Sequence, residues 1–325
     1  MVNLFANTTP YETSNDIADN FVPQFECCFL GAPSSCKTTL LACLDMAFCQ
    51  MTAGGHLSVY SMEGQYPFQE VFYELEHAAD TREQGKFETC ILSTKELMEW
   101  DYCAFIGDGL LDFRIHDCPG SWLGISQSTQ NGLISLIETA QRSSVIIVTI
   151  NAAQLMESDS VSPEGMLASN ISFVLDKAFE NDDDREHLIL LVPTKCETYM
   201  QDAEERDRLL ERVEEVFSAT IRLAESPAYK GRLAVVYLPV QTVGNVRFQQ
   251  ILNPWEEVYI KDTKRPFSPK NVDQLTFWLL KFLLRQYVRA EKYADSDIEA
   301  DVDKWLKRLG TGGIAVLCGK ELLGL

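Results

Sequence analysis

The residues best suited to chemistry lie in a short loop near the start of the sequence. An apolar run over residues 25–30 stops at Gly31, and a few small residues lead into Lys37-Thr38-Thr39 and an apolar, helix-forming stretch. Backbone N–H groups of such a loop and the positive end of the helix bind phosphate, the lysine neutralises outer phosphates, and the first hydroxyl residue ligates Mg²⁺. The pattern therefore predicts a phosphate-binding loop in which Lys37 and Thr38 take these two roles.

One position departs from the pattern G-x-x-x-x-G-K-[ST], because Cys36 occupies the place of the second glycine. A side chain there can crowd the phosphates or demand a backbone conformation that glycine reaches more easily. If the loop holds phosphates, the Cys36 thiol lies among N–H donors beside Lys37, which predicts a lowered thiol pKa and a reactive sulfur. Otherwise Cys36 is a small apolar filler, or the stretch is an ordinary strand, turn and helix. The loop residues expected to contact a ligand are Gly31, Ser34, Ser35, Cys36, Lys37, Thr38 and Thr39.

A second candidate site follows a predicted β-hairpin. Residues 100–106 and 110–116 have strand character on either side of a glycine-rich turn, and Asp117-Cys-Pro-Gly120 comes directly after them. An aspartate at a strand end, followed three residues later by glycine, matches D-x-x-G. In nucleotide triphosphatases with this motif the aspartate holds the Mg²⁺ shell and the glycine N–H senses the γ-phosphate. A capping aspartate in a strand-to-loop turn would give the same four residues.

A third candidate site follows the buried strand predicted over residues 187–193. The sequence there is Thr194-Lys195-Cys-Glu197, at the place where guanine-specific enzymes carry [NT]-K-x-D. In that motif the lysine stem lies over the purine, and the carboxylate accepts two hydrogen bonds from the N1 and N2 edge of guanine. Glu197 keeps the charge and adds a methylene. The alternative is a loop leading into a helix, with Lys195 and Glu197 simply exposed.

The remaining pattern indicates strands alternating with helices. Helices are predicted over 37–51, 68–79, 128–142, 166–180, 203–224 and 272–287. Further strands are predicted over 21–30, 56–60, 144–150 and 233–238. Loops are predicted over 151–165, 239–244 and 253–270, and the backbone around Gln241 and Thr242 could close over a base. The apolar tail, residues 310–325, could dock within the chain or onto a partner strand.

Composition excludes several classes of partner. The chain has 325 residues, of which 46% are hydrophobic and 23% charged, which is ordinary for a folded protein with a large core. Its formal charge of -20 argues against nucleic acid or an anionic membrane as the main partner, because both require a basic surface.

The cysteines and the N-terminal residues indicate a reducing compartment. Ten cysteines are scattered without a repeated C-x-x-C pair, and there are only four histidines, so neither a zinc site nor a disulfide framework is predicted. Residues 1–20 lack the basic start and apolar stretch of a signal peptide and are expected to be a flexible leader. No segment approaches the apolar length of a membrane span. We therefore expect a cytoplasmic protein.

The three candidate sites each follow an apolar strand, in the order that a nucleotide site requires. In a doubly wound sheet those strand ends form the ligand crevice. On these motifs the sequence resembles the Ras-like, translation-factor-related P-loop GTPases over residues 21–290. The resemblance implies an α/β P-loop NTPase fold, with a mostly parallel, doubly wound sheet and one antiparallel hairpin strand. It also implies that the chain binds GTP or GDP with Mg²⁺.

The resemblance further implies a switch I threonine that ligates Mg²⁺ and senses the γ-phosphate. Thr94, which lies 23 residues before Asp117, has the expected spacing, and Thr89 is the alternative. Catalytic roles are expected for Lys37 and Thr94, and metal ligation for Thr38, Thr94 and Asp117. Ser121, instead of the water-orienting glutamine of many relatives, follows Gly120, and Gln127 lies further along. Slow hydrolysis is therefore expected.

Finer features are similar to the bacterial double-GTPase families of conflict (antiviral) systems. These features are an additional strand and helix before the hairpin, the loop 239–244, and a proline-rich loop before the last apolar helix. The resemblance implies other protein subunits as partners, namely a second GTPase-like protein or an effector. It also implies a helical extension and tail over residues 291–325. The alternative is a pseudo-GTPase scaffold, which Cys36, Glu197 and the missing glutamine would suit.

Overall fold

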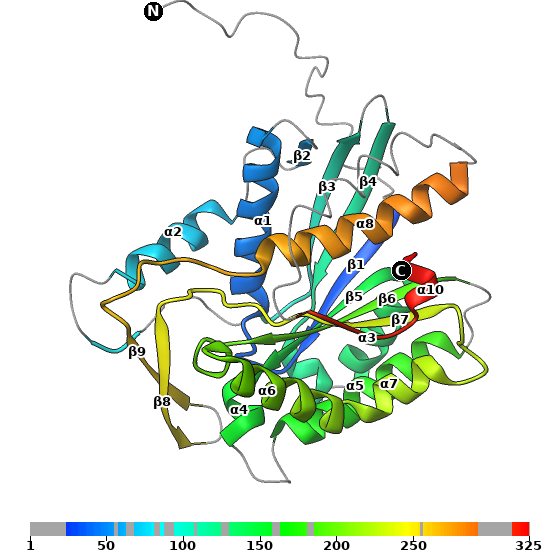
Figure 1. Cartoon of the computed structure of the whole chain (residues 1–325). Helices are drawn as coiled ribbons and strands as arrows, with labels where there is room; N and C mark the ends of the chain where they lie inside the picture. Colours follow the sequence, from blue (N-terminus) through cyan, green and yellow to red (C-terminus); the bar gives the residue numbers. More distant parts are fainter. Residues whose placement is uncertain are drawn as a thin grey trace, which may run out of the picture.

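An eight-stranded sheet runs through the centre of the chain, in the order β10-β7-β6-β5-β1-β4-β3-β2 (Figure 1). The computed structural model describes residues 24–54, 58–62, 68–80, 85–87, 94–106, 109–124, 130–157, 163–180, 185–253, 256–291 and 314–324. The strands are β1 (Phe25–Gly31), β2 (Ser58–Ser61), β3 (Met98–Ile106), β4 (Gly109–Asp117), β5 (Ser143–Asn151), β6 (His187–Thr194), β7 (Leu233–Tyr237) and β10 (Ala315–Cys318).

The five central strands are parallel and the outer strands are antiparallel. β1 pairs in parallel with β4 and β5, and β5, β6 and β7 continue the parallel pairing. β3 and β4 form an antiparallel hairpin, and β2 pairs antiparallel with the outer edge of β3. The predicted fold class is confirmed: this is an α/β protein with a mostly parallel sheet and an antiparallel hairpin.

Helices cover both faces of the sheet because successive strand residues point to opposite sides. α1 and α8 lie on one face of the sheet, and α3, α5 and α7 on the other (Figure 1). Cys27 and Phe29 of β1 belong to the core cluster that includes α1 and α8, whereas Cys28 and Leu30 belong to the cluster that includes α3, α5 and α7. The helices are α1 (Lys37–Gly54), α2 (Gln69–Ala78), α3 (Gln130–Arg142), α4 (Ala152–Glu157), α5 (Pro163–Phe179), α6 (Ala203–Val216), α7 (Ser218–Glu225), α8 (Val272–Glu291) and α10 (Lys320–Leu323). Continuous apolar strands such as β6 are therefore buried on both faces.

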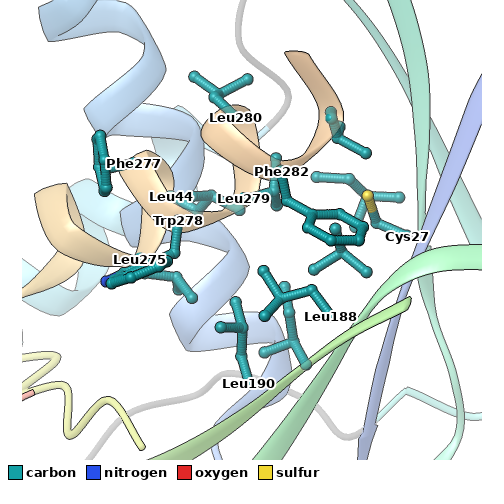
Figure 2. Close-up of a cluster of buried hydrophobic side chains, with 14 of the residues drawn as sticks. Cys27, Leu44, Leu188, Leu190, Leu275, Phe277, Trp278, Leu279, Leu280 and Phe282 are labelled. Carbon is teal, nitrogen blue, oxygen red and sulfur yellow. The ribbon is translucent and has the colours of Figure 1, made fainter. Parts of the chain in front are cut away.

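The apolar helix predicted near the end of the chain is α8, and it forms the main contact on the α1 face. Phe282 points from α8 toward Cys27 of β1 and Leu188 of β6, and Leu279 lies beside it (Figure 2). Phe282 is only 1% exposed. The apolar run in α8 is thus explained by packing on the sheet.

The prediction of a long loop over residues 253–270 is wrong in its first part. β8 (Val246–Asn253) and β9 (Glu256–Lys261) form a separate two-stranded antiparallel sheet. Residues 257–261 alternate charged or aromatic side chains with Val258 and Ile260, which is a strand pattern. Three nearby prolines concealed that pattern, although all three lie outside the two strands.

Two other predicted elements differ from those observed. The single helix expected over 203–224 is broken at Phe217, which is fully buried and non-helical (φ −95°, ψ 16°), so α6 and α7 can both pack on the core. The loop expected over 151–165 contains α4. Asn151 caps that helix, since its side-chain oxygen accepts a hydrogen bond from Gln154 N at 3.3 Å.

The apolar tail docks within the chain. β10 pairs antiparallel with β7, and Gly319 follows it in a left-handed conformation (φ +74°). A Cβ at Gly319 would lie 2.5 Å from the Leu233 carbonyl oxygen, so only glycine fits this approach. The predicted leader (residues 1–20) and most of the predicted extension (residues 292–313) lie outside the described residues. Among the helices described, none has the length and apolar composition that a membrane span requires.

We expect Phe282→Ala to lower the free energy of unfolding by about 3–5 kcal/mol, because it leaves a cavity between α8 and the sheet. Phe173 is the matched control, since it also lies on a helix but is 48% exposed. Phe173→Ala should change the free energy of unfolding by no more than about 0.5 kcal/mol. Urea denaturation followed by circular dichroism measures both. Equal losses in the two variants would contradict the packing described for α8.

Candidate functional site

A cavity of about 640 Å³ opens at the carboxyl ends of the central strands. Strand register brings those ends together, because Gly31 of β1 lies beside Thr149 of β5, and Asn151 of β5 beside Thr194 of β6. The cavity is lined by the loop after β1, by residues 94–95 and 120–121, and by residues that follow β6, that lead from β7 into β8, and that belong to β9. All three predicted motifs therefore border one space.

The loop after β1 is held in shape by its own polar groups. Ser35 Oγ donates to the Ala32 carbonyl at 2.8 Å and lies 2.7 Å from Thr149 Oγ1. Lys37 Nζ donates to the carbonyl oxygens of Gly31 and Ala32, each at 3.0 Å. The Lys37 side chain thus folds back over the loop that leads into α1. The phosphate-binding pattern predicts the lysine at this place.

Two residues of the loop have the left-handed backbone that glycine favours. Ser34 has φ 63° and Cys36 has φ 62°. Cys36 therefore occupies a position with a genuine preference for glycine, which explains why the motif carries one there. The expectation of a lowered thiol pKa is wrong: burial raises the pKa of Cys36, and the opposing charges of Lys195 and Lys37 do not offset it.

An aspartate and two hydroxyls form a compact cluster at the cavity edge. Asp117 Oδ2 accepts hydrogen bonds from Thr94 Oγ1 at 2.7 Å and from Thr38 Oγ1 at 3.0 Å, and the two hydroxyl oxygens lie 3.0 Å apart. Asp117 Oδ1 is buried and has no hydrogen-bond partner among the described residues. Burial raises the pKa of the Asp117 carboxyl, against the hydrogen bonds from both threonines and the charge of Lys37.

This cluster fits the Mg²⁺ that the sequence implied. Its donors are all oxygen atoms, which hard divalent cations prefer, and the unpaired Asp117 Oδ1 is a buried acceptor that a cation shell would satisfy. Of the two candidate switch threonines, Thr94 contacts both Asp117 and Thr38, whereas Thr89 lies outside the described residues.

Gly120 of the D-x-x-G motif approaches the loop after β1 too closely for any side chain. A Cβ at Gly120 would lie 2.4 Å from Pro33 N and 2.5 Å from the Ala32 carbonyl carbon. Ser121, which follows it, lines the cavity. The backbone of the D-x-x-G motif therefore lies directly against the loop after β1.

A second buried carboxylate borders the same cavity at the end of β6. Glu197 is 4% exposed, and its Oε1 accepts hydrogen bonds from Val243 N and Gly244 N, each at 3.2 Å. Its Oε2 has no partner in the described part of the chain. Burial raises the pKa of Glu197, although the backbone donors and Lys195 act in the opposite direction.

The other residues predicted around the base take different positions. Thr194 Oγ1 donates to the Ser35 carbonyl at 3.0 Å, so it joins β6 to the loop after β1. Thr242 lines the cavity, but Gln241 does not, because it exchanges backbone hydrogen bonds with Lys270. The backbone that reaches Glu197 thus lies one to two residues beyond the predicted pair.

Sequence reasoning missed several residues that line this cavity, among them Phe87, Lys95, Glu257 and Tyr259. Glu257 Oε2 lies 2.5 Å from Lys195 Nζ, so the motif lysine is paired with a carboxylate from β9. The alternating pattern of residues 257–261 was the available signal. It was assigned to a loop, so no side chain of β9 could be placed.

Comparison with known proteins gives only distant structural similarity, and neither a family model nor a curated protein matches the sequence. The Chaetomium thermophilum signal recognition particle receptor SRb, solved with GTP and SRX, has a TM-score of 0.41 and 12% identity over 69% of this chain and 94% of that chain. The S. cerevisiae Ski7 GTPase-like domain bound to GTP has a TM-score of 0.36 and 16% identity, over 67% of this chain and 42% of that chain. The bacterial selenocysteine-specific elongation factor EF-Sec has a TM-score of 0.32 and 12% identity, over 66% of this chain and 26% of that chain.

We expect Cys36→Gly to be more stable than Cys36→Ala by about 1 kcal/mol, because only alanine retains a Cβ in the left-handed conformation. Both variants lack the thiol, so the difference isolates the backbone. Ala42 in α1 is the control: Ala42→Gly should destabilise by at least about 1 kcal/mol, the opposite sign. Urea denaturation of the three variants provides the measurement, and a Cys36→Ala protein at least as stable as Cys36→Gly would contradict the assigned conformation.

Proposed function

We propose that this chain is a Mg²⁺-dependent guanine-nucleotide switch that binds GTP and GDP and hydrolyses GTP slowly. One observation carries the proposal. Two buried carboxylates, Asp117 and Glu197, each keep an oxygen without a partner among the described residues, and both belong to motifs that border one cavity. Such atoms are costly in a folded protein, and a nucleotide with its cation would satisfy both.

The carboxylate of Glu197 favours guanine over adenine on chemical grounds. An ionised carboxylate only accepts hydrogen bonds. Guanine presents N–H donors at N1 and at its 2-amino group, whereas adenine presents an unprotonated N1 and no 2-amino group. With Oε1 held by two backbone N–H groups, Oε2 is the atom left to accept from the base.

The other end of the nucleotide is assigned to the loop after β1. Lys37 would neutralise the outer phosphates, and Thr38, Thr94 and Asp117 would hold the Mg²⁺, which offsets phosphate charge when bound. Gly120 lies against the loop, so its N–H would be close enough to respond to the terminal phosphate. Since Thr94 connects the cation site to the segment before β3, loss of that phosphate would release the segment, which is the basis of a switch.

Slow hydrolysis is inferred from the residue that follows Gly120. Ser121 lines the cavity where a glutamine would orient the attacking water, and its short side chain has less reach. Gln127 lies outside the described residues.

The resemblance to double-GTPase families supports a finer proposal. In it the chain acts in a bacterial defence system beside a second GTPase-like protein or an effector. Co-expression with the neighbouring gene products, followed by light scattering, tests this idea, and a monomer in every combination would rule it out.

GTP should bind on the order of 100-fold more tightly than ATP in the presence of Mg²⁺, because ATP cannot satisfy Glu197 and places an acceptor against it. Isothermal titration calorimetry measures both affinities. Lys37→Ala should weaken GTP binding, whereas Lys230→Ala, an exposed lysine far along the chain, should not. Equal affinity for ATP would remove the guanine assignment, and unchanged binding by Lys37→Ala would remove the loop assignment.

A scaffold that has lost its nucleotide is the second candidate, favoured by the side chain of Cys36 at a left-handed position of the loop. The two functions differ in what the purified protein carries. Under the switch proposal, mass spectrometry of nucleotide released by denaturation should detect GDP or GTP in near-stoichiometric amount. Recovery of none, together with no binding by calorimetry, would support the scaffold instead.

A further inference from the structure

Strand β9 supplies a wall of the cavity that none of the three nucleotide motifs accounts for. Glu257 and Tyr259 lie two residues apart, so their side chains share one face of the strand, and both line the cavity. The same cavity contains Lys195 and Glu197, the residues assigned to the base. The β9 side chains therefore lie at the nucleoside end of the site.

Both carboxylate oxygens of Glu257 already accept hydrogen bonds from other residues of the chain. Its Oε1 accepts from Asn151 Nδ2 at 2.9 Å and from Gln154 Nε2 at 2.7 Å, and its Oε2 accepts from Lys195 Nζ at 2.5 Å. Three donors, from β5, from α4 and from the loop after β6, thus hold the carboxylate in place. Glu257 acts on the site through Lys195, whose charged end it fixes.

The hydroxyl of Tyr259 has no such partner. Tyr259 is 8% exposed, and its Oη is buried without a hydrogen bond to any of the described residues. Burial raises the pKa of the phenol, so the hydroxyl stays protonated and can both donate and accept. An unpartnered polar atom at the wall of a cavity is suited to a ligand.

The ring that carries this hydroxyl is held from several sides. The backbone carbonyl of Tyr259 accepts a hydrogen bond from Phe87 N at 2.9 Å. The Tyr259 ring packs edge-on against the Phe248 ring, with 5.8 Å between the ring centroids. Lys195 Nζ lies 5.7 Å from the ring centroid, between Tyr259 and Glu257. The hydroxyl is therefore presented from a fixed position, which lowers the entropic cost of a contact.

We propose that the Tyr259 hydroxyl is a further specificity contact of the site, which hydrogen-bonds the guanosine moiety of the bound nucleotide, with Glu257 as a positioning residue acting through Lys195. The proposal rests on the proposed function and adds a recognition residue from outside the nucleotide motifs. Its ligand atom belongs to the base or to the ribose.

Tyr259→Phe tests the proposal because it removes one oxygen atom and leaves the ring. We expect it to weaken binding of Mg²⁺-GDP about five- to tenfold in calorimetry, the effect of one neutral hydrogen bond. The melting temperature without nucleotide should stay the same or rise, since the lost hydroxyl had no partner. Tyr237→Phe is the matched control: Tyr237 Oη is also buried without a partner among the described residues, but it does not line the cavity.

Nucleotide analogues identify the contacted group. IDP lacks the 2-amino group of the base, 2′-deoxy-GDP lacks the 2′-hydroxyl, and 3′-deoxy-GDP lacks the 3′-hydroxyl. The loss of affinity caused by Tyr259→Phe should disappear for the analogue that lacks the contacted group. If the base O6 or N7 is contacted, the loss should persist for all three analogues.

The proposal is overturned if Tyr259→Phe binds GDP as tightly as the wild type, or if it loses melting temperature in parallel with affinity, which would mark a structural role. A wild-type protein that binds no guanine nucleotide would instead overturn the proposed function and this contact with it. The wild-type titration therefore separates the two failures.

Discussion

The register of the parallel strands is the constraint on which the whole site depends. It places Gly31 beside Thr149 and Asn151 beside Thr194, so that the loops after β1, β5 and β6 leave the sheet at one edge, next to Asp117 at the end of β4. A slip of one residue would turn every side chain of a strand to the opposite face. Because these strands are apolar on both faces, α1 and α8 on one side and α3 and α5 on the other oppose such a slip.

The polar groups gathered at that edge reduce the stability of the fold. Burial raises the pKa values of Asp117 and Glu197 above their ordinary range. A carboxyl with a raised pKa in the folded state holds its proton more tightly than in the unfolded chain. Stability without a ligand therefore decreases as pH rises through the ordinary pKa toward the raised one. The positive φ of Cys36 adds backbone strain. Concentrating such costs in one cavity is typical of a functional site.

The architecture could be predicted from the sequence because the apolar strands and the three motifs are each formed by short, consecutive stretches of the chain. Sequence reasoning predicted Thr38, Thr94 and Asp117 as ligands of one ion from a strand end and a fixed spacing. Their side chains do lie together in the structure, and ion binding stays a prediction. Sequence reasoning could not separate roles that depend on distant contacts. Thr194 was expected at the base, yet its hydroxyl anchors Ser35, a contact between residues 159 positions apart. Glu257 was missed because its strand was assigned to a loop.

Main-chain pairing fixes the position of β9 in the wall of the cavity. It is bonded along one edge to β8 and along the other to residues 85–87, through Phe87 N to the Tyr259 carbonyl and Lys261 N to the Gly85 carbonyl. Swinging β9 outward as a gate would break backbone hydrogen bonds on at least one of these edges. The place of this wall is therefore set by main-chain pairing. A change of the β9 side chains would reshape the surface of the cavity without moving the strand that carries them.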